Sequence, residues 1–227
     1  QLGLKRIEAL LAELGNPERR FRSIHVTGTN GKGSTTALLA AILHAAGIRT
    51  GMYTSPHLVD YPERMTMEGQ EISRDEFAAM IGKTRLAAEA IQARCMESPT
   101  EFEVLTAAAF LWFAEKQVEM AVVEVGLGGL LDSTNVICPV ASVITNVTLE
   151  HTDRCGGTVA EIAAHKAGII KIGAPVFTGA TGEALAVIEA AAARKHSACS
   201  VLNREFFVSD VVIGETEQSF LFSGPAE

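Results

Sequence analysis

A glycine-rich turn between a strand pattern and a helix pattern is the feature that most restricts how this chain of 227 residues can fold. Residues 23–28 read SIHVTG and favour a short buried strand, while residues 34–46 are rich in alanine and leucine and favour a helix. Glycines in such a turn let backbone N–H groups point inward, and the start of the helix adds a partial positive charge. The arrangement is typical of a phosphate-binding loop in an α/β protein.

The turn itself, residues 28–35, reads GTNGKGST and departs from the usual spacing. The common pattern G-x-x-x-x-G-K-[S/T] has more residues before its glycine–lysine pair than the two found here, and an extra Gly33 follows the lysine. Lys32 can still neutralise phosphate oxygens, and the hydroxyl of Ser34 or Thr35 can reach Mg²⁺. The alternatives are an ordinary strand-to-helix turn and a dinucleotide loop, which needs no lysine at the phosphates.

Strand and helix patterns alternate along the rest of the chain, which predicts right-handed βαβ units and a mostly parallel sheet flanked by helices. A small hairpin is expected around Glu68-Gly69, and Ser73 and Glu76 have the spacing of a capping box. The tail, residues 206–224, differs and favours a small antiparallel β element near the C-terminus. Helix patterns cover residues 4–14, 34–46, 73–94, 101–116, 158–170 and 183–195, and strand patterns cover residues 23–28, 49–55, 119–125, 140–147, 174–179 and 199–204.

Composition excludes several classes of function. The formal net charge of −8 argues against nucleic-acid binding, which needs a basic face. No apolar run is long enough to span a bilayer, and residues 1–15 have an amphipathic helix pattern, not that of a signal peptide. The four cysteines have neither zinc nor redox spacing, which favours reduced thiols in a cytoplasmic protein.

Two polar residues at predicted strand ends are candidates for a metal site. Glu124 lies in the apolar stretch VVEVGLGG, where a carboxylate is costly unless it is paired or bound to a metal. Ligands gather at the carboxyl edge of open α/β sheets, and Mg²⁺ prefers carboxylate, hydroxyl and phosphate oxygens. Ser55, in YTSPHL, also follows a strand. The alternatives are a buried glutamate paired to a structural Lys or Arg, and a simple Ser-Pro turn.

Two further candidates are His151 and Lys166. His151 follows the strand pattern of residues 140–147 and would lie at the same edge of the sheet, although an isolated histidine is a weak signal. Lys166, in AAHKAGIIK, lies among apolar residues on a predicted helix. A buried lysine tends to lose its proton and can then act as a base or be chemically modified. A snorkelling surface lysine is the equal alternative.

Taken together and in this order, these groups resemble the folylpolyglutamate synthase/dihydrofolate synthase family of the Mur-ligase-like amide ligases. The resemblance covers residues 2–180. The stretches that carry it are HVTGTNGKGS, YTSPHL, ERMTMEGQEIS, TEFEVLTAAAFLWF, VVEVGLGGLLDSTN, VITNVTLEHTD and HKAGIIK.

The resemblance implies a P-loop NTPase-like Mur ligase central domain over residues 1–227 and an ATP-dependent ligase that joins L-glutamate to dihydropteroate or folates through an acyl phosphate. It implies catalytic roles for Lys32, Glu124, His151 and Lys166, the last as a carbamylated lysine. Two Mg²⁺ sites would take ligands from Ser34, Ser55, Glu124 and His151. The implied ATP-binding residues are Thr29, Asn30, Gly31, Lys32, Gly33, Ser34 and Thr35, and the implied pterin contacts are Thr100, Phe102 and Asp132.

The chain also departs from the family pattern. Leu130 stands where the family usually has Arg, Glu150 replaces an Asp, and the sequence Ala-His before Lys166 replaces Arg-Glu. The family's C-terminal glutamate-ligase domain is expected to be absent from this chain, which we expect to be monomeric and inactive on its own. The alternatives are a non-catalytic nucleotide-binding module of the same fold and a Mur-type ligase acting on cell-wall precursors.

Overall fold

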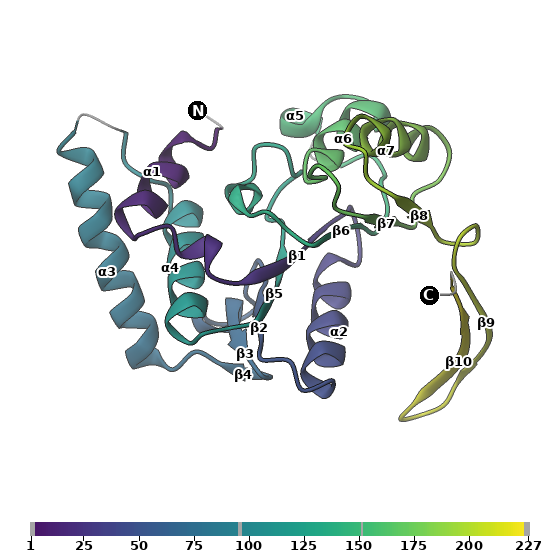
Figure 1. The fold of residues 1–227 in the computed structure, drawn as a ribbon, viewed down its shortest axis with the longest axis horizontal. Coiled ribbons are helices and arrows are strands. Elements are labelled where there is room, and N and C mark those ends of the chain that lie inside the picture. Colours follow the sequence, from purple (N-terminus) through teal and green to yellow (C-terminus); the bar gives the residue numbers. More distant parts are fainter. Residues whose placement is uncertain (1–2, 95–96, 151, 225–227) are drawn as a thin grey trace.

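The computed structural model describes residues 3–94, 97–150 and 152–224, and Figure 1 shows their arrangement. Helices and strands alternate over most of the chain, as the sequence predicts. The helices are α1 (Lys5–Glu13), α2 (Lys32–Ala45), α3 (Arg74–Gln92), α4 (Glu101–Glu115), α5 (Thr152–Cys155), α6 (Val159–Ala167) and α7 (Gly182–Arg194), with 3-10 turns η1 (Pro17–Arg19), η2 (Tyr61–Arg64) and η3 (Ser133–Val136). The strands are β1 (Arg22–Thr27), β2 (Thr50–Tyr53), β3 (Met65–Met67), β4 (Gln70–Glu71), β5 (Met120–Glu124), β6 (Ala141–Ile144), β7 (Val176–Thr178), β8 (Cys199–Val201), β9 (Phe207–Ile213) and β10 (Gln218–Ser223).

The main sheet has the strand order β4-β3-β2-β5-β1-β6-β7-β8. Strands β2, β5, β1, β6, β7 and β8 are parallel, and β3 and β4 add an antiparallel edge. The mostly parallel sheet is therefore confirmed, as is the hairpin at Glu68-Gly69, where both residues have positive φ. Because the parallel strands end at one edge, the loops after β1, β2, β5 and β6 are brought together there.

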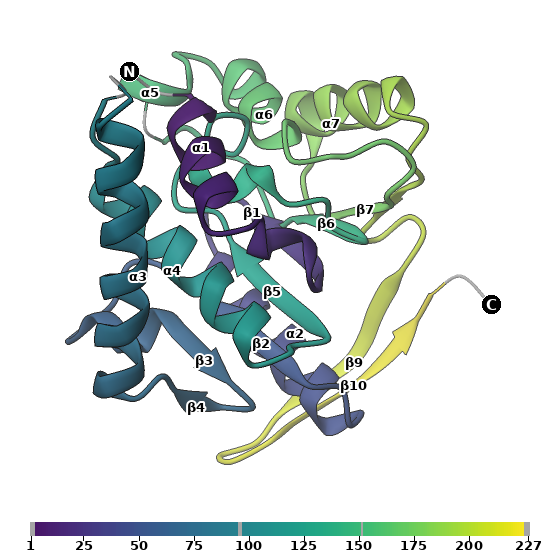
Figure 2. The ribbon, with the colours of Figure 1, turned by 60° about the vertical axis from the view of Figure 1, so that its left-hand side comes forward.

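Helices cover both faces of this sheet. Figure 1 and Figure 2 show α1, α3 and α4 on one side of strands β2, β5 and β1, with α2 on the other side. The larger apolar core joins α1, α3 and α4 to β2 and β5, and a second core packs α6 and α7 against β6 and β7. Strand β5 is buried along its whole length, which explains why its sequence is continuously apolar up to its final glutamate.

Local capping explains where the helices begin. Thr100 starts α4 with a capping box to Glu103, and Thr158 starts α6 in the same way. The capping box predicted at Ser73 is only half formed. The Ser73 hydroxyl accepts from the Glu76 amide, but the Glu76 carboxylate forms an ion pair with Lys116 and does not return the bond to the Ser73 amide.

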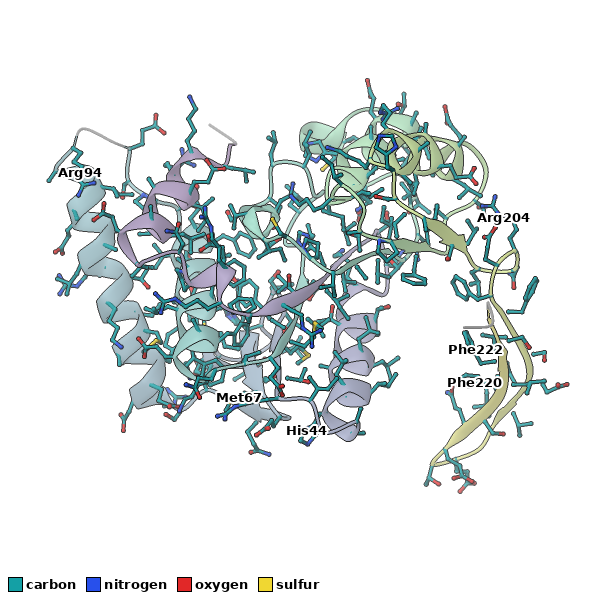
Figure 3. The ribbon with its side chains drawn as sticks, viewed as in Figure 1. His44, Met67, Arg94, Arg204, Phe220 and Phe222 are labelled. Atoms are coloured by element: carbon teal, nitrogen blue, oxygen red, sulfur yellow. The ribbon has the colours of Figure 1, made fainter. Side chains whose placement is uncertain are left out.

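The antiparallel element expected near the C-terminus is the hairpin β9–β10, which extends away from the main sheet (Figure 1). Every residue of both strands is exposed, including Phe220 and Phe222, whose side chains Figure 3 labels. The hairpin is linked to the sheet at its base, where Phe206 lies 6.5 Å from the Phe177 ring and 6.5 Å from the Phe222 ring. Within the described residues, no helix is both long and apolar enough to cross a membrane.

Candidate nucleotide and substrate site

The glycine loop connects β1 to α2 and packs tightly against the segment that follows β6. Gly28 has φ +152°, and a Cβ there would lie 1.8 Å from the Thr145 hydroxyl, so only glycine fits without a shift of the backbone. The Thr145 hydroxyl also donates to the Asn30 carbonyl at 2.7 Å. Gly31 is the N-cap of α2, with φ +79°. The predicted strand–turn–helix unit is thus confirmed, and its loop is held by the segment that follows β6.

Several backbone amides of the loop already donate to protein acceptors and are not available to bind a phosphate. Thr29 N donates to the Asn146 carbonyl and Asn30 N to the Asn146 side chain, each at 2.9 Å. Thr35 N donates to Gly31 O within the helix. Of the residues predicted to bind ATP, the other four, Gly31, Lys32, Gly33 and Ser34, lie at the first turn of α2. Helical N–H groups there have no intrahelical acceptor, and the helix dipole favours an anion.

Lys32 is half-buried and folds back over its own loop. Its Nζ donates to the carbonyls of Gly28 at 2.9 Å and Thr29 at 3.1 Å. The ammonium is therefore held directly above the loop, and phosphate oxygens would replace these two carbonyls as its partners.

Glu124, the last residue of β5, faces the same loop. Its side chain is 4% exposed, its Oε2 accepts from Ser55 N at 3.1 Å, and a Cβ on Gly33 would lie 3.7 Å from both of its carboxylate oxygens. Burial raises the pKa of Glu124, against the Ser55 amide and the charge of Lys32. In the described part of the chain no lysine or arginine forms an ion pair with Glu124, so the alternative of a structural salt bridge is not supported.

Lys166 is buried, 1% exposed, on α6, so the alternative of a snorkelling surface lysine is wrong. Its Nζ donates to Gly28 O at 2.8 Å and to Glu150 Oε1 at 2.6 Å. Burial lowers the pKa of Lys166, and the Glu150 carboxylate opposes that shift. Lys166 and Lys32 therefore share one carbonyl of the glycine loop. His151, the other residue expected near this point, lies outside the described residues.

A cavity of about 440 Å³ is lined by Ser55, whose amide bonds Glu124, and by no residue of the glycine loop itself. Thr100, Phe102 and Asp132, the three residues expected to contact a pterin, all line its wall. The Thr100 hydroxyl is engaged in the cap of α4, and the Phe102 ring stacks on Tyr53 at 6.2 Å. The remaining lining residues are Gly3, Arg6, Pro56, Arg64, Glu103, Gly126, Leu127, Leu131, Ser133, Cys155 and His165.

Asp132 is the most constrained of the three. It is 6% exposed, its Oδ1 accepts from the Thr134 amide at 3.0 Å and the Thr134 hydroxyl at 2.5 Å, and its Oδ2 accepts from Leu127 N at 2.8 Å. Burial raises the pKa of Asp132, against these hydrogen bonds from Thr134 and Leu127. A side chain at Gly126 would displace the Phe102 ring, because a Cβ there would lie 2.5 Å from that ring.

Sequence reasoning missed three polar groups at this site. Arg6 reaches the pocket from α1 and bonds Glu103 at 3.1 Å, and Arg64 donates to His57 at 2.9 Å from η2. His165 lines the pocket as well, and burial lowers its pKa. In the sequence, Arg6 is a charged residue beside an apolar helix pattern, which is commonplace on surface helices. Arg64 lies in the stretch ERMTMEGQEIS, which carries the resemblance but gave no role to this residue.

The expected metal ligands are brought together only in part. The Ser55 amide donates to the Glu124 carboxylate, and Ser34 lies in the first turn of α2, next in sequence to Gly33, on which a Cβ would lie 3.7 Å from that carboxylate. Among the residues that the structure describes, no three His, Cys, Asp or Glu side chains form a cluster that could hold a metal by themselves. Leu130, the position where Arg was expected, is 46% exposed, and its Cβ lies 2.5 Å from where a Cβ on Gly168 would be.

The sequence and the fold both match known proteins. A family model described as the Mur ligase middle domain matches residues 26–176. A dihydrofolate synthase/folylpolyglutamate synthase of Bacillus subtilis is 44% identical over 212 residues, which make up 89% of this chain and 49% of that protein.

Solved structures extend the match to the whole fold. Folylpolyglutamate synthase of Mycobacterium tuberculosis, solved with ADP and AMPPCP, superposes with a TM-score of 0.93 at 36% identity, over 97% of this chain and 52% of that one. A complex of FPGS with AMPPCP and folate gives a TM-score of 0.93 at 42% identity, over 96% of this chain and 54% of that one. The chain thus spans about half the length of the curated relatives it matches.

Proposed function

The chain belongs to the Mur ligase family, in its folylpolyglutamate synthase/dihydrofolate synthase branch, and from this premise we propose that it is the ATP-binding part of a folate-type amide ligase. The ligase joins L-glutamate to dihydropteroate, to folylpoly-γ-glutamates or to both. One observation carries the proposal: Ser55 bonds Glu124 beside the glycine loop and also lines the pocket. An ATP γ-phosphate at the loop would therefore face a carboxylate-bearing substrate in the pocket.

The reaction has two halves. The substrate carboxylate attacks the γ-phosphorus of ATP, which forms an acyl phosphate and releases ADP. The amine of L-glutamate then attacks the acyl carbon, and the tetrahedral intermediate collapses to an amide with loss of phosphate. Phosphoryl transfer of this kind depends mainly on positioning and on charge neutralisation.

The loop supplies both of these. The amides of Gly31, Lys32, Gly33 and Ser34 would hold the β- and γ-phosphates at the start of α2. The Lys32 ammonium donates hydrogen bonds to two loop carbonyls in this structure. With ATP bound it would donate to the phosphate oxygens instead and neutralise part of their negative charge. The ADP and AMPPCP bound to structural neighbours support nucleotide binding by this fold.

The residues around Glu124 fit Mg²⁺. A buried carboxylate that accepts a single backbone amide retains acceptor capacity for a hard cation, and the Ser55 and Ser34 hydroxyls are oxygen ligands of the same class. When bound with ATP, Mg²⁺ would supply positive charge to the phosphate oxygens. His151 belongs to this proposal on its sequence position alone.

Lys166 is proposed to carry the carbamate that its family position implies. A buried amine with a lowered pKa suits CO₂ addition, because CO₂ reacts only with the neutral form. The bond to Glu150 works against this reaction, since it favours the ammonium form. A ¹³C carbamate signal that appears with ¹³C-bicarbonate and is absent in Lys166→Met would support the modification, and no signal at saturating bicarbonate would exclude it.

The pocket is proposed to hold the pterin. The Phe102 ring offers an apolar surface to the heterocycle, and the Asp132 carboxylate accepts from its N–H groups. Thr100 lies at the same wall and contributes through the start of α4, since its hydroxyl is already bonded. We further propose that the enzyme is a cytoplasmic monomer, in which Cys138 and Cys199 are reduced thiols.

The test is ADP release by the natural full-length protein, with ATP, Mg²⁺, L-glutamate and either dihydropteroate or a reduced folate. ADP release should require both glutamate and one of the pterin substrates. Lys32→Met should abolish it, whereas Lys195→Met, which removes an exposed lysine at the end of α7, should not. A rate of ADP release that does not change when pterins or folates are added would refute the proposal.

ATP binding without any turnover would instead favour a non-catalytic nucleotide-binding module. That alternative and a cell-wall ligase are not favoured by relatives named for folate ligation.

A further inference from the structure

A buried chain of three polar side chains leads from the middle of β1 to the wall of the pocket. His25 is fully buried, and its Nε2 lies 2.8 Å from the Thr134 hydroxyl oxygen. The same oxygen lies 2.5 Å from Asp132 Oδ1. Thr134 is also completely buried, whereas Asp132 reaches the pocket, so the chain has one end in the core and the other at the ligand.

The chemistry of the groups gives the chain a direction. A threonine hydroxyl has a single hydrogen, and a hydrogen bond to a carboxylate is shorter and stronger than one between neutral groups. The short contact therefore shows that the Thr134 hydroxyl donates its hydrogen bond to Asp132. The Thr134 oxygen is then free to accept a hydrogen bond from the Nε2–H of His25. The ring nitrogen left without hydrogen is Nδ1, which has no hydrogen-bond partner within the described part of the chain.

The surroundings of His25 keep its ring neutral. Complete burial, together with the nearby charge of Lys171, lowers the pKa of His25 to about 3. At neutral pH the ring consequently carries one hydrogen. Its placement on Nε2 makes His25 a donor to Thr134 and allows Thr134 to be a donor to Asp132.

The result is a carboxylate with one fixed orientation. Oδ1 is occupied twice by Thr134, through its amide and its hydroxyl, while Oδ2 accepts from Leu127. An aspartate held at both oxygens loses its freedom to rotate before a ligand arrives, which reduces the entropy lost on binding. The ionisable groups that share the pocket with Asp132 are Arg6, Arg64, Glu103, Cys155 and His165.

We propose that His25 and Thr134 are positioning residues that hold the Asp132 carboxylate as an oriented acceptor for the N–H edge of a heterocyclic substrate. This inference rests on the proposed function, because it takes the pocket to bind a pterin-like ring. Neither residue lines the pocket, and both act through Asp132.

Substitutions at Thr134 provide the first test, in the natural full-length protein. Thr134→Val keeps the shape and removes the hydroxyl, whereas Thr134→Ser keeps the hydroxyl. Loss of one charge-assisted hydrogen bond should raise KM for dihydropteroate about tenfold or more. KM for ATP and kcat should change by no more than about twofold, because the glycine loop is untouched, and the serine variant should be close to wild type.

His25 provides the second test. His25→Gln keeps a side-chain N–H donor and should retain most of the affinity for dihydropteroate, whereas His25→Leu should raise KM as Thr134→Val does. The ¹⁵N chemical shifts of His25 in the wild-type protein should report the neutral Nε2–H form at pH 7. That measurement needs no variant to fold.

The outcomes separate the two ideas. Wild-type protein that uses no pterin or folate would refute the proposed function. Wild-type activity together with an unchanged dihydropteroate KM in Thr134→Val, or an Nδ1–H form of His25, would overturn the positioning role alone. Equal losses of kcat and of affinity for ATP and dihydropteroate in Thr134→Val and Thr134→Ser would assign Thr134 a general structural role and also overturn it.

Discussion

Replacing His25 by glutamine should make the protein less sensitive to acid. His25 is fully buried and its pKa is lowered to about 3, against 6.5 for an ordinary histidine. Between those two pH values the unfolded chain binds a proton at this residue and the folded chain does not. The stability that His25 contributes is therefore complete above pH 6.5 and is lost progressively as the pH falls towards 3.

The size of the effect follows from the two pKa values. At pH 5 the unfolded state gains about 2 kcal/mol from protonation of His25 while the folded state gains almost nothing. Wild-type protein should therefore lose about 2 kcal/mol more stability than His25→Gln between pH 7.5 and pH 5. Other titrating groups contribute equally to both proteins, so the difference isolates His25.

Urea unfolding at the two pH values measures this difference. Trp112, the single tryptophan, is 3% exposed on α4 and its fluorescence should report the loss of the core. His44→Gln, which removes an exposed histidine from α2, is the matched control. If His25→Gln and wild type lose the same free energy on acidification, or if both histidine variants differ from wild type equally, the burial argument is wrong.

Three further predictions concern the loop and its neighbours. Gly28→Ala should destabilise the protein by about 2 kcal/mol or more, because the φ of +152° at Gly28 and its contact with Thr145 leave no room for a methyl group. The control Gly82→Ala, on α3, should be neutral or stabilise the protein by up to about 1 kcal/mol, and urea unfolding measures both changes. Because the pKa of Glu124 is raised, this carboxylate should be protonated, and Mg²⁺-dependent ATP affinity lost, at a higher pH than if Glu124 had the pKa of an exposed glutamate. In calorimetric titrations, Glu124→Gln should abolish the dependence of ATP affinity on Mg²⁺. Lys166→Met should lower stability by about 1–2 kcal/mol, because Glu150 loses its ion pair with Lys166. Lys166→Met/Glu150→Gln should recover part of that loss, and full additivity of the two single changes would show that the two residues do not interact.

Much of the fold could be predicted from local pattern. Each main strand and helix of the βαβ series follows from apolar periodicity and from turn residues, because those signals depend on residues within a few positions of one another. The Ser73 cap shows the limit. The Ser73 hydroxyl does cap the helix, yet the Glu76 carboxylate bonds Lys116, distant in the sequence, and the Ser73 hydroxyl instead of the Ser73 amide.

The sequence predicted that the candidate site residues would lie together, and it did not predict their hydrogen bonds. Lys32, Ser55, Glu124 and Lys166 do gather at one edge of the sheet, because parallel strands end together. The bond between Lys166 and Glu150, and the double use of the Gly28 carbonyl, depend on distances across the fold that no local pattern encodes. His25 is the clearest omission, since a single histidine in an apolar strand gives no indication of its partner 109 positions away.

The pairing of β1 also has a consequence for how the protein folds. Residues 22–27 take their two neighbours from residues 120–124 and 141–144, so the strand that carries the glycine loop is completed only by segments far along the chain. Bringing such distant segments together lowers the conformational entropy of the chain before the strand contacts that offset this loss have formed. Parallel sheets of this kind therefore fold slowly. On refolding, helical signal should return before nucleotide affinity does. During synthesis the loop would leave the ribosome long before the residues that shape it, and it would remain without function until β6 had emerged.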